Sequence, residues 1–316
     1  MIKTKEVTFR ARDLNDLEMK GKLFFPENFD ENQKHPAIVV NHPTSSDFNQ
    51  TSGKIYATKL AKKGWLALAY DSPYQGQSAG EPHNSELPHA RTLGVMAAID
   101  YLDSLDYVNP DQIGAMGICG GGGFTLNAAK VDHRIKAVAG VAPANVGNVY
   151  RETFGQNNQA LINTLDDMAK QRTAEAQGAP IKYIPVLPES QEARKAAGIT
   201  DIDTEQAIDY YLTPRGNDKF APNQFAYTSL AMDLGYDPLA LADKLLTQPL
   251  ELIVGGIPGG FGSYRFAYEF YDKAASENKE LTVFPGVTHY ELYDQPEATD
   301  KAVAKLDEFF NKNLEK

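Results

Sequence analysis

The chemistry in this sequence centres on its single cysteine, Cys119. It follows an apolar run at 113–118 and lies within the stretch Gly-Ile-Cys-Gly-Gly at 117–121, directly before a segment of small residues. A reactive side chain on a sharp strand-to-helix turn needs neighbours without side chains, so that it can approach a substrate and the next N–H can donate to an oxyanion. A helix N-terminus at Gly120 also lowers the pKa of a thiol there. The pattern predicts a nucleophile rather than the buried small hydrophobe that a lone cysteine usually is.

A matching base is expected at His289, in a loop between the last apolar run, 280–284, and the C-terminal helical segment. In enzymes with a nucleophile on a strand-turn-helix, the histidine comes last in chain order and reaches back over the sheet. Alone, His289 would be interpreted as a surface loop histidine. Together with Cys119, it is predicted to be the general base.

The second oxyanion donor should come from the loop after an apolar run at 37–41. Pro43 in that loop has no N–H, so the backbone N–H of Thr44 is the candidate, beside that of Gly120. His42 is either a second catalytic or substrate-contacting group or a structural histidine beside a proline turn.

A carboxylate to orient the histidine is harder to find. The loop after the apolar run 250–254, at 255–263, is rich in glycine and contains no Asp or Glu. Either the site is a Cys-His dyad, or an acid comes from elsewhere, with Glu291, Asp294 and Asp233 as the candidates. A thiol tolerates the loss of the acid better than a hydroxyl does, because it ionises nearer to neutral pH.

The elements that must position these residues alternate along the chain. Segments 5–13 and 18–26 are expected to form an antiparallel hairpin at a sheet edge. Further strands are expected at 37–41, 65–70, 113–118, 135–141, 250–254 and 280–284, and helices at 55–63, 91–105, 120–129, 264–275 and 299–311. The alternation predicts an α/β fold, a mainly parallel central sheet with helices covering both faces.

The alternation stops between 143 and 237, where the chain is polar but contains several tyrosines and phenylalanines. Helical patterns near 160–175, 190–197 and 204–212 predict an inserted helical cap rather than a disordered linker, because disordered segments are usually poor in aromatic residues. We therefore expect an α/β core made of 1–142 and 238–316, with a cap, or lid, at 143–237.

These residues resemble the α/β-hydrolase superfamily, in particular its dienelactone-hydrolase-like bacterial branch, in which a Gly-x-Cys-x-Gly elbow carries the nucleophile. The resemblance extends to segments 69–78 and 286–294, and the insert lies where such proteins carry their lid. It implies the α/β-hydrolase fold and hydrolysis of an ester, thioester or lactone through an acyl-cysteine. The alternatives are an acyl transferase, a carbon-carbon hydrolase, or a non-catalytic small-molecule-binding protein that has lost its acid.

Composition limits the partners. The formal net charge of -11 over 316 residues disfavours nucleic acid and anionic membranes, and no stretch resembles a signal peptide or a membrane span. The six histidines are scattered and the glycine loop lacks a P-loop ending, so neither a metal nor an organic cofactor is expected. The expected partner is a small or medium acyl substrate, the expected location is the cytoplasm, and assembly as a homo-oligomer is left open.

Overall fold

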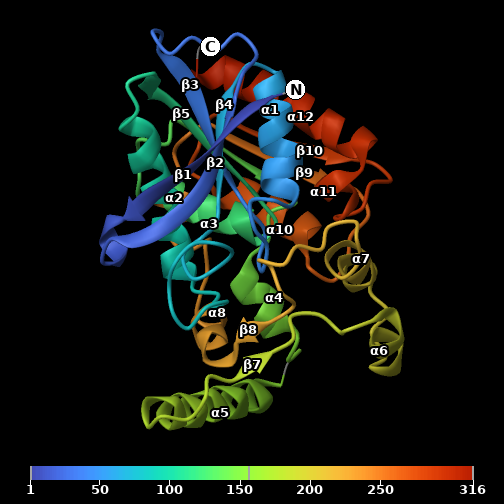
Figure 1. Cartoon of the computed structure of the whole chain (residues 1–316). Coiled ribbons are helices and arrows are strands. Elements are labelled where there is room, and N and C mark those ends of the chain that lie inside the picture. Colours follow the sequence, from blue (N-terminus) through green and yellow to red (C-terminus); the bar gives the residue numbers. More distant parts are fainter. Residues whose placement is uncertain (1, 156, 315–316) are drawn as a thin grey trace.

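The computed structural model describes residues 2–155 and 157–314, and these form a central eight-stranded sheet in the order β1-β2-β4-β3-β5-β6-β9-β10 (Figure 1). The strands of this sheet are β1 (Lys3–Ala11), β2 (Leu17–Phe25), β3 (His35–Asn41), β4 (Leu66–Tyr70), β5 (Val108–Ile118), β6 (Ala137–Val141), β9 (Leu250–Gly255) and β10 (Lys279–Phe284). Strand β2 pairs antiparallel with β1 and β4, whereas all neighbours from β4 to β10 are parallel. The predicted mainly parallel sheet and its antiparallel hairpin are confirmed.

Helices cover both faces of this sheet, as predicted. In the core they are α1 (Thr58–Lys62), α2 (Pro88–Asp103), α3 (Gly120–Ala129), α9 (Ala242–Leu245), α10 (Ser263–Lys273), α11 (Glu291–Asp294) and α12 (Pro296–Leu314). Two glycines of β5 show the two faces: a Cβ on Gly114 would meet Phe310 of α12, and one on Gly117 would meet Gly121 of α3. Because these positions are three apart, they point to opposite sides of the strand.

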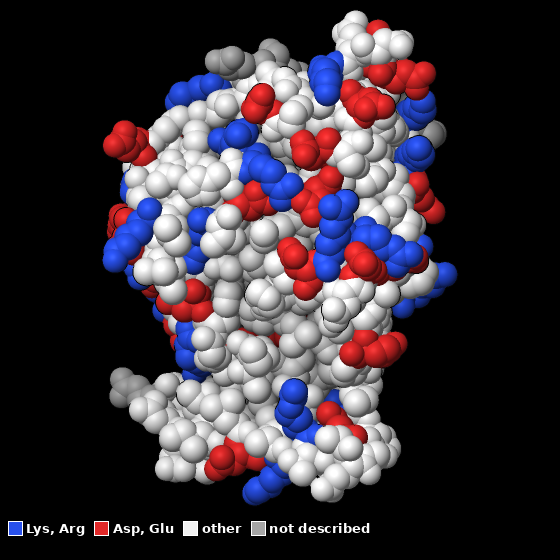
Figure 2. Space-filling view, turned by 90° about the vertical axis from the view of Figure 1, so that its left-hand side faces the viewer, with Lys and Arg blue, Asp and Glu red and all other residues white. Residues whose placement is uncertain are grey.

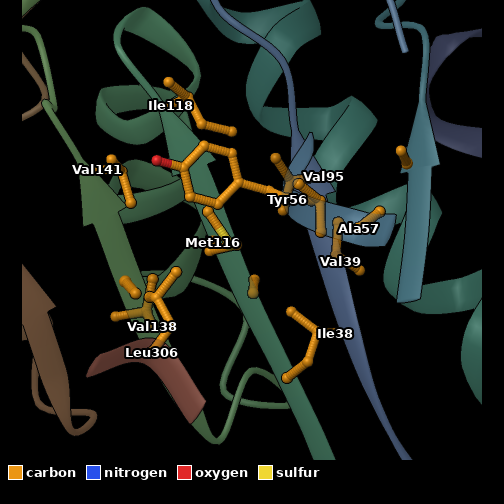
Figure 3. Packing of buried hydrophobic residues seen from close by; sticks show 14 of the residues in the cluster. Ile38, Val39, Tyr56, Ala57, Val95, Met116, Ile118, Val138, Val141 and Leu306 are labelled. Carbon is orange, nitrogen blue, oxygen red and sulfur yellow. The ribbon is translucent and has the colours of Figure 1, made fainter. Parts of the chain in front are cut away.

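The hydrophobic core extends directly beneath the candidate site. Figure 3 shows the ring of Tyr56 lying against Met116 and Ile118 of β5, and all three side chains are fully buried. The sequence predicted a regular helix at 55–63, but the structure has a wider helical turn, η2 (Thr51–Ala57), followed by the short α1. The Tyr56 hydroxyl donates to the carbonyl of Leu292, 2.6 Å away, so a buried polar group finds its acceptor and η2 fixes the backbone of α11.

The segment 143–237, which we call the insert, connects β6 with the last part of the core and lies at the bottom of Figure 1. Its elements are α4 (Val146–Glu152), α5 (Asn158–Ala176), β7 (Tyr183–Ile184), α6 (Gln191–Ala196), α7 (Ile202–Tyr211), β8 (Phe225–Ala226), η3 (Tyr227–Ser229) and α8 (Leu230–Leu234). The three predicted helical segments are confirmed as α5, α6 and α7. The pairing of β7 with β8 was not predicted, because strands of two residues leave no alternation to detect.

Candidate active site

Cys119 occupies a sharp turn between β5 and α3, with φ 53° and ψ −125°. Few non-glycine residues adopt this conformation, so the surroundings must enforce it. The backbone N–H of Cys119 donates to Val141, 3.0 Å away, and its carbonyl accepts from Gly122 and Ala144 at 2.9 Å. A Cβ on Gly117 would lie 2.2 Å from the carbonyl oxygen of Gly121, so the turn requires glycine there.

Cys119 lines a cavity, and His289 and Tyr293 lie close enough to its thiol to act on the pKa of Cys119. Burial raises the pKa of Cys119, but the charge of His289 and the hydrogen bond with His289 oppose this effect. With smaller contributions from Tyr293 and the N–H of Gly120, the net result is a pKa of Cys119 below the ordinary value. The arrangement therefore favours the thiolate, which is the reactive form of cysteine.

His289 lies in the loop between β10 and α11 and is 3% exposed. Its Nε2 is 3.3 Å from the Tyr293 hydroxyl, and its Nδ1 is 2.9 Å from Oγ of Ser263. Burial lowers the pKa of His289, but the neighbouring Cys119 thiolate and hydrogen bond, followed by nearby carboxylates, raise it above the usual value. The structure thus brings the two residues predicted from the sequence together, with their pKa values shifted in opposite directions.

Ser263 takes the position where a histidine-orienting carboxylate was sought. It begins α10, directly after the glycine-rich loop 256–262, and its side chain is buried. The absence of Asp and Glu in this loop is evident from the sequence, but Ser263 was not predicted as the partner of Nδ1. A polar residue at the end of that loop is the signal that would have found it.

None of the three acid candidates makes a hydrogen bond to His289 among the described residues. The Glu291 carboxylate accepts from the N–H and hydroxyl of Thr288, and Asp294 forms a two-fold hydrogen-bonded ion pair with Arg215 of the insert at 2.7 and 2.8 Å. Asp233 of α8 is fully buried, and burial, more than any neighbouring charge, raises its pKa well above the usual range. These carboxylates serve the packing of α11 and the insert rather than contacting the imidazole.

The two oxyanion-donor candidates lie next to each other. A Cβ placed on Gly120 would lie 2.1 Å from Oγ1 of Thr44, so the Thr44 side chain can lie against the Gly120 backbone only because residue 120 is glycine. Both Thr44 and Cys119 line the cavity. Gly120 opens α3, and its N–H is therefore one of the free donors at a helix N-terminus.

His42 supports the Thr44 loop from below. Its Nε2 accepts from the N–H of Ser72 at 3.0 Å, so its Nδ1 carries the proton and donates to the carbonyl of Pro43 at 2.7 Å. Burial, followed by the charge of Arg91, holds the pKa of His42 well below its usual range. A neutral, fully buried histidine with both nitrogens engaged is structural, which decides between the two alternatives.

A cavity of about 300 Å³ lies above Cys119, between the core and the insert. The core contributes a few residues around the thiol: Thr44, Ser45, Cys119, Phe261, Tyr290 and Tyr293. The insert contributes the larger, mostly apolar part: Ala144, Val146, Val149, Tyr150, Thr153, Val186, Leu187, Pro188, Ile199, Thr204, Tyr211, Leu212, Ala221, Pro222 and Asn223. None of these described lining residues is charged.

The charged residues lie elsewhere on the protein. Figure 2 shows Lys and Arg intermingled with Asp and Glu over one face, without a large patch of one sign.

Within the described ranges, no group of three or more His, Cys, Asp or Glu side chains is arranged to hold a metal ion. Among the described residues, no helix combines the length and the apolar character needed to cross a bilayer.

The sheet order, the helices on both faces and the strand-turn-helix at Cys119 define an α/β-hydrolase fold. The model of the dienelactone hydrolase family matches residues 19–164. The chain is also 36% identical over 312 residues to the uncharacterized protein YcjY of Escherichia coli (strain K12), an alignment covering 98% of this chain and 99% of that protein. The chain belongs to the dienelactone hydrolase family.

Solved structures agree with this fold. The crystal structure of hypothetical protein PA2218 from Pseudomonas aeruginosa has a TM-score of 0.88 at 30% identity, covering 99% of this chain and 94% of that one. The structure of the alpha/beta hydrolase GrgF from Penicillium sp. sh18 has a TM-score of 0.79 at 20% identity, covering 99% and 100%. In sequence, the polyketide transferase grgF of Penicillium sp. is 32% identical over 133 residues, 41% of this chain and 42% of that protein.

Proposed function

We propose that the protein is a cysteine-dependent hydrolase of esters, thioesters or lactones that works through an acyl-cysteine intermediate. The observation that carries this proposal is the pairing of Cys119 with His289 beside the cavity, where the thiol pKa is lowered and the imidazole pKa is raised. Both shifts favour a thiolate-imidazolium pair, the reactive state of a cysteine nucleophile. Membership of the dienelactone hydrolase family is consistent with this chemistry.

In the proposed first step, the Cys119 thiolate attacks the carbonyl carbon of the substrate. The N–H groups of Gly120 and Thr44 donate to the resulting oxyanion, and this stabilises the tetrahedral intermediate. The protonated His289 gives its proton to the leaving oxygen or sulfur as the carbon-heteroatom bond breaks, which leaves an acyl-cysteine.

In the second step, neutral His289 takes a proton from water, and the hydroxide equivalent attacks the thioester carbonyl. The same two N–H groups hold the second oxyanion, and its collapse releases the carboxylic acid and the Cys119 thiolate. Ser263 keeps the imidazole oriented through its contact with Nδ1 in both steps. A lone reactive thiol is maintained best in a reducing compartment, so we place the reaction in the cytoplasm.

The cavity limits the substrate to an uncharged acyl group of small to medium size. A volume of about 300 Å³ lies at the lower end for ligand sites, and the lining offers hydroxyl and amide groups but no charge. A carboxylate in the acyl group would lose its hydration without gaining a cationic partner there. Because most of the lining belongs to the insert, we propose that the insert is the lid that selects the acyl group.

The proposal is tested by incubating the wild type, Cys119→Ser and His289→Ala with p-nitrophenyl esters and thioesters of increasing chain length, and measuring intact mass and product. An acyl adduct on the wild type that forms and decays at the rate of product release is the expected result, with no thiol adduct on Cys119→Ser. Ser104→Ala, an exposed change at the end of α2, is the control. Absence of any adduct, together with an unreactive thiol, would favour the non-catalytic binding protein.

Acyl transfer is the second candidate, and it is supported by the similarity of part of the chain to a protein named polyketide transferase. Transfer differs from hydrolysis only in what attacks the acyl-cysteine. Adding alcohol, amine and thiol acceptors to the pre-formed acyl-enzyme separates the two. Faster loss of the adduct with formation of the acceptor ester, amide or thioester indicates a transferase, whereas an unchanged rate with only free acid indicates a hydrolase.

A further inference from the structure

The glycine-rich loop that lacks a carboxylate is held by two carboxylates of the insert. The N–H of Gly260 donates to Asp201 at 2.9 Å, and the N–H of Phe261 donates to Asp203 at 2.9 Å. Asp201 also caps the start of α7, accepting from the N–H of Asp203. The beginning of helix α7 is therefore fastened to the loop that leads into Ser263.

Asp203 is almost completely buried. Its side chain is 1% exposed, and only one of its oxygens has a hydrogen-bond partner; Oδ1 has none among the described residues. A Cβ on Gly259 would lie 2.2 Å from its carboxyl carbon, so the loop has room for this carboxylate only because it has a glycine there. A buried carboxylate is costly unless a positive charge or further donors compensate, and no Lys or Arg forms an ion pair with it in the described ranges.

The positive group that acts on Asp203 is the imidazolium of His289. Two residues of the loop contact it: the ring of Phe261 lies edge-on with the centroids 5.9 Å apart, and Oγ of Ser263 is 2.9 Å from Nδ1. Phe261 thus donates its backbone N–H to Asp203 while its ring contacts the ring of His289. The Asp203 carboxylate is thus held by the same segment whose Ser263 hydroxyl contacts the imidazole.

We infer that Asp203, supplied by the insert, is the carboxylate of this site: it stabilises the protonated form of His289 through space, while Ser263 makes the direct hydrogen bond. This inference rests on the proposed function. The chain order then becomes Cys119, Asp203, His289, which is the order of nucleophile, acid and base in this fold. Asp203 is a positioning residue, because it acts through His289 and touches no substrate.

The electrostatics agree with this role. The groups that act on His289 are Cys119, Asp203 and Asp201, and the two carboxylates both raise the pKa of His289 against the effect of its burial. Reciprocally, burial raises the pKa of Asp203, and the charge of His289 is the largest effect opposing it. Removing the charge of Asp203 should therefore lower the pKa of His289 and, through the ion pair, raise that of Cys119.

Since Asp203 belongs to the insert, the protonation state of Cys119 depends on how the insert packs against the glycine-rich loop of the core. Thr204, the next residue in α7, lines the cavity. A bound acyl group that contacts Thr204 thus supports the helix turn that holds Asp203 behind the histidine. The lid that selects the substrate would then also contribute to the activation of the thiol.

The test measures the rate of Cys119 alkylation by iodoacetamide against pH in the wild type, Asp203→Asn, Asp203→Ala and Asp209→Asn, with thermal unfolding of each. Asn at 203 keeps an acceptor for Phe261 but removes the charge. We expect its alkylation midpoint to rise by about one unit, which makes alkylation roughly tenfold slower below the midpoint. Asp209→Asn changes an exposed carboxylate of the same helix and should match the wild type.

The outcomes separate this inference from the proposed function. If Asp203→Asn matches the wild type while Asp203→Ala unfolds more readily and reacts more slowly, Asp203 only anchors the loop and the inference is wrong. If the wild-type thiol itself reacts no faster than an ordinary cysteine, the proposed function fails first. Asp203→Ser removes the same charge and replaces Asp203→Asn should that variant not fold.

Discussion

Replacing Ser263 with alanine should slow acylation of Cys119. Ser263 Oγ lies 2.9 Å from Nδ1 of His289, and both side chains are buried. In the ion pair Nδ1 carries a proton, and the substitution removes its acceptor. A hydrogen bond to a charged group contributes about 1.5–3 kcal/mol, which corresponds to a roughly 10- to 150-fold smaller population of the reactive pair.

The assay is the second-order rate constant for acylation by a p-nitrophenyl ester, measured from pH 5 to 9 together with the melting temperature. Ser276→Ala is the matched control, because Ser276 is also buried and donates to a carbonyl, that of Asn278 at 3.0 Å, outside the site. We expect Ser263→Ala to lose the stated factor at pH 7 and Ser276→Ala to lose none.

The reasoning is refuted if Ser263→Ala acylates as fast as the wild type with the same pH midpoint. His289 would then be oriented by its ring contacts and by Tyr293 alone, and the serine would be only a packing residue. An equal loss in both serine variants would point to a general loss of stability rather than to the hydrogen bond.

Three further changes test other parts of the structure. Gly120→Ala should lower turnover tenfold or more with little change in the alkylation rate, because the new Cβ would lie 2.1 Å from Oγ1 of Thr44 and would push that residue away. Unchanged turnover would show that Thr44 is not an oxyanion donor. The buried Glu251 has its pKa raised to about 7, chiefly by burial, so it stabilises the fold below about pH 4.5 and loses this as pH rises through 7. Glu251→Gln should gain up to about 3 kcal/mol at pH 8 over pH 4.5 relative to the wild type in urea unfolding, and a pH-independent difference would contradict this. Arg215→Ala should cost about 1 kcal/mol at low salt and less at 1 M salt, because it removes the half-buried ion pair with Asp294 that joins the insert to α11; equal loss at both salt concentrations would assign the effect to packing.

Local patterns in the sequence were enough to find the main elements. The alternation of apolar runs predicted the order of strands and helices, and the glycines around Cys119 predicted its strand-turn-helix. At this sharp turn, where Cys119 has a positive φ, neighbouring atoms lie so close to residues 117 and 120 that only glycine fits there. The regular helix predicted at 55–63 was wrong in detail. There the fully buried Tyr56 must reach the carbonyl of Leu292, and tertiary packing widened the turn.

The sequence by itself determined the pair of Cys119 and His289, because their positions relative to strand ends follow from chain order in this fold. It did not determine what surrounds the imidazole. Ser263 meets Nδ1 of His289 across 26 positions of the chain, and Asp203 of the insert is joined to the loop before α10 by its hydrogen bond with Phe261, across 58 positions. Such contacts depend on the docking of distant segments, which no local spacing records, so the tertiary structure alone decided which groups hold the imidazole.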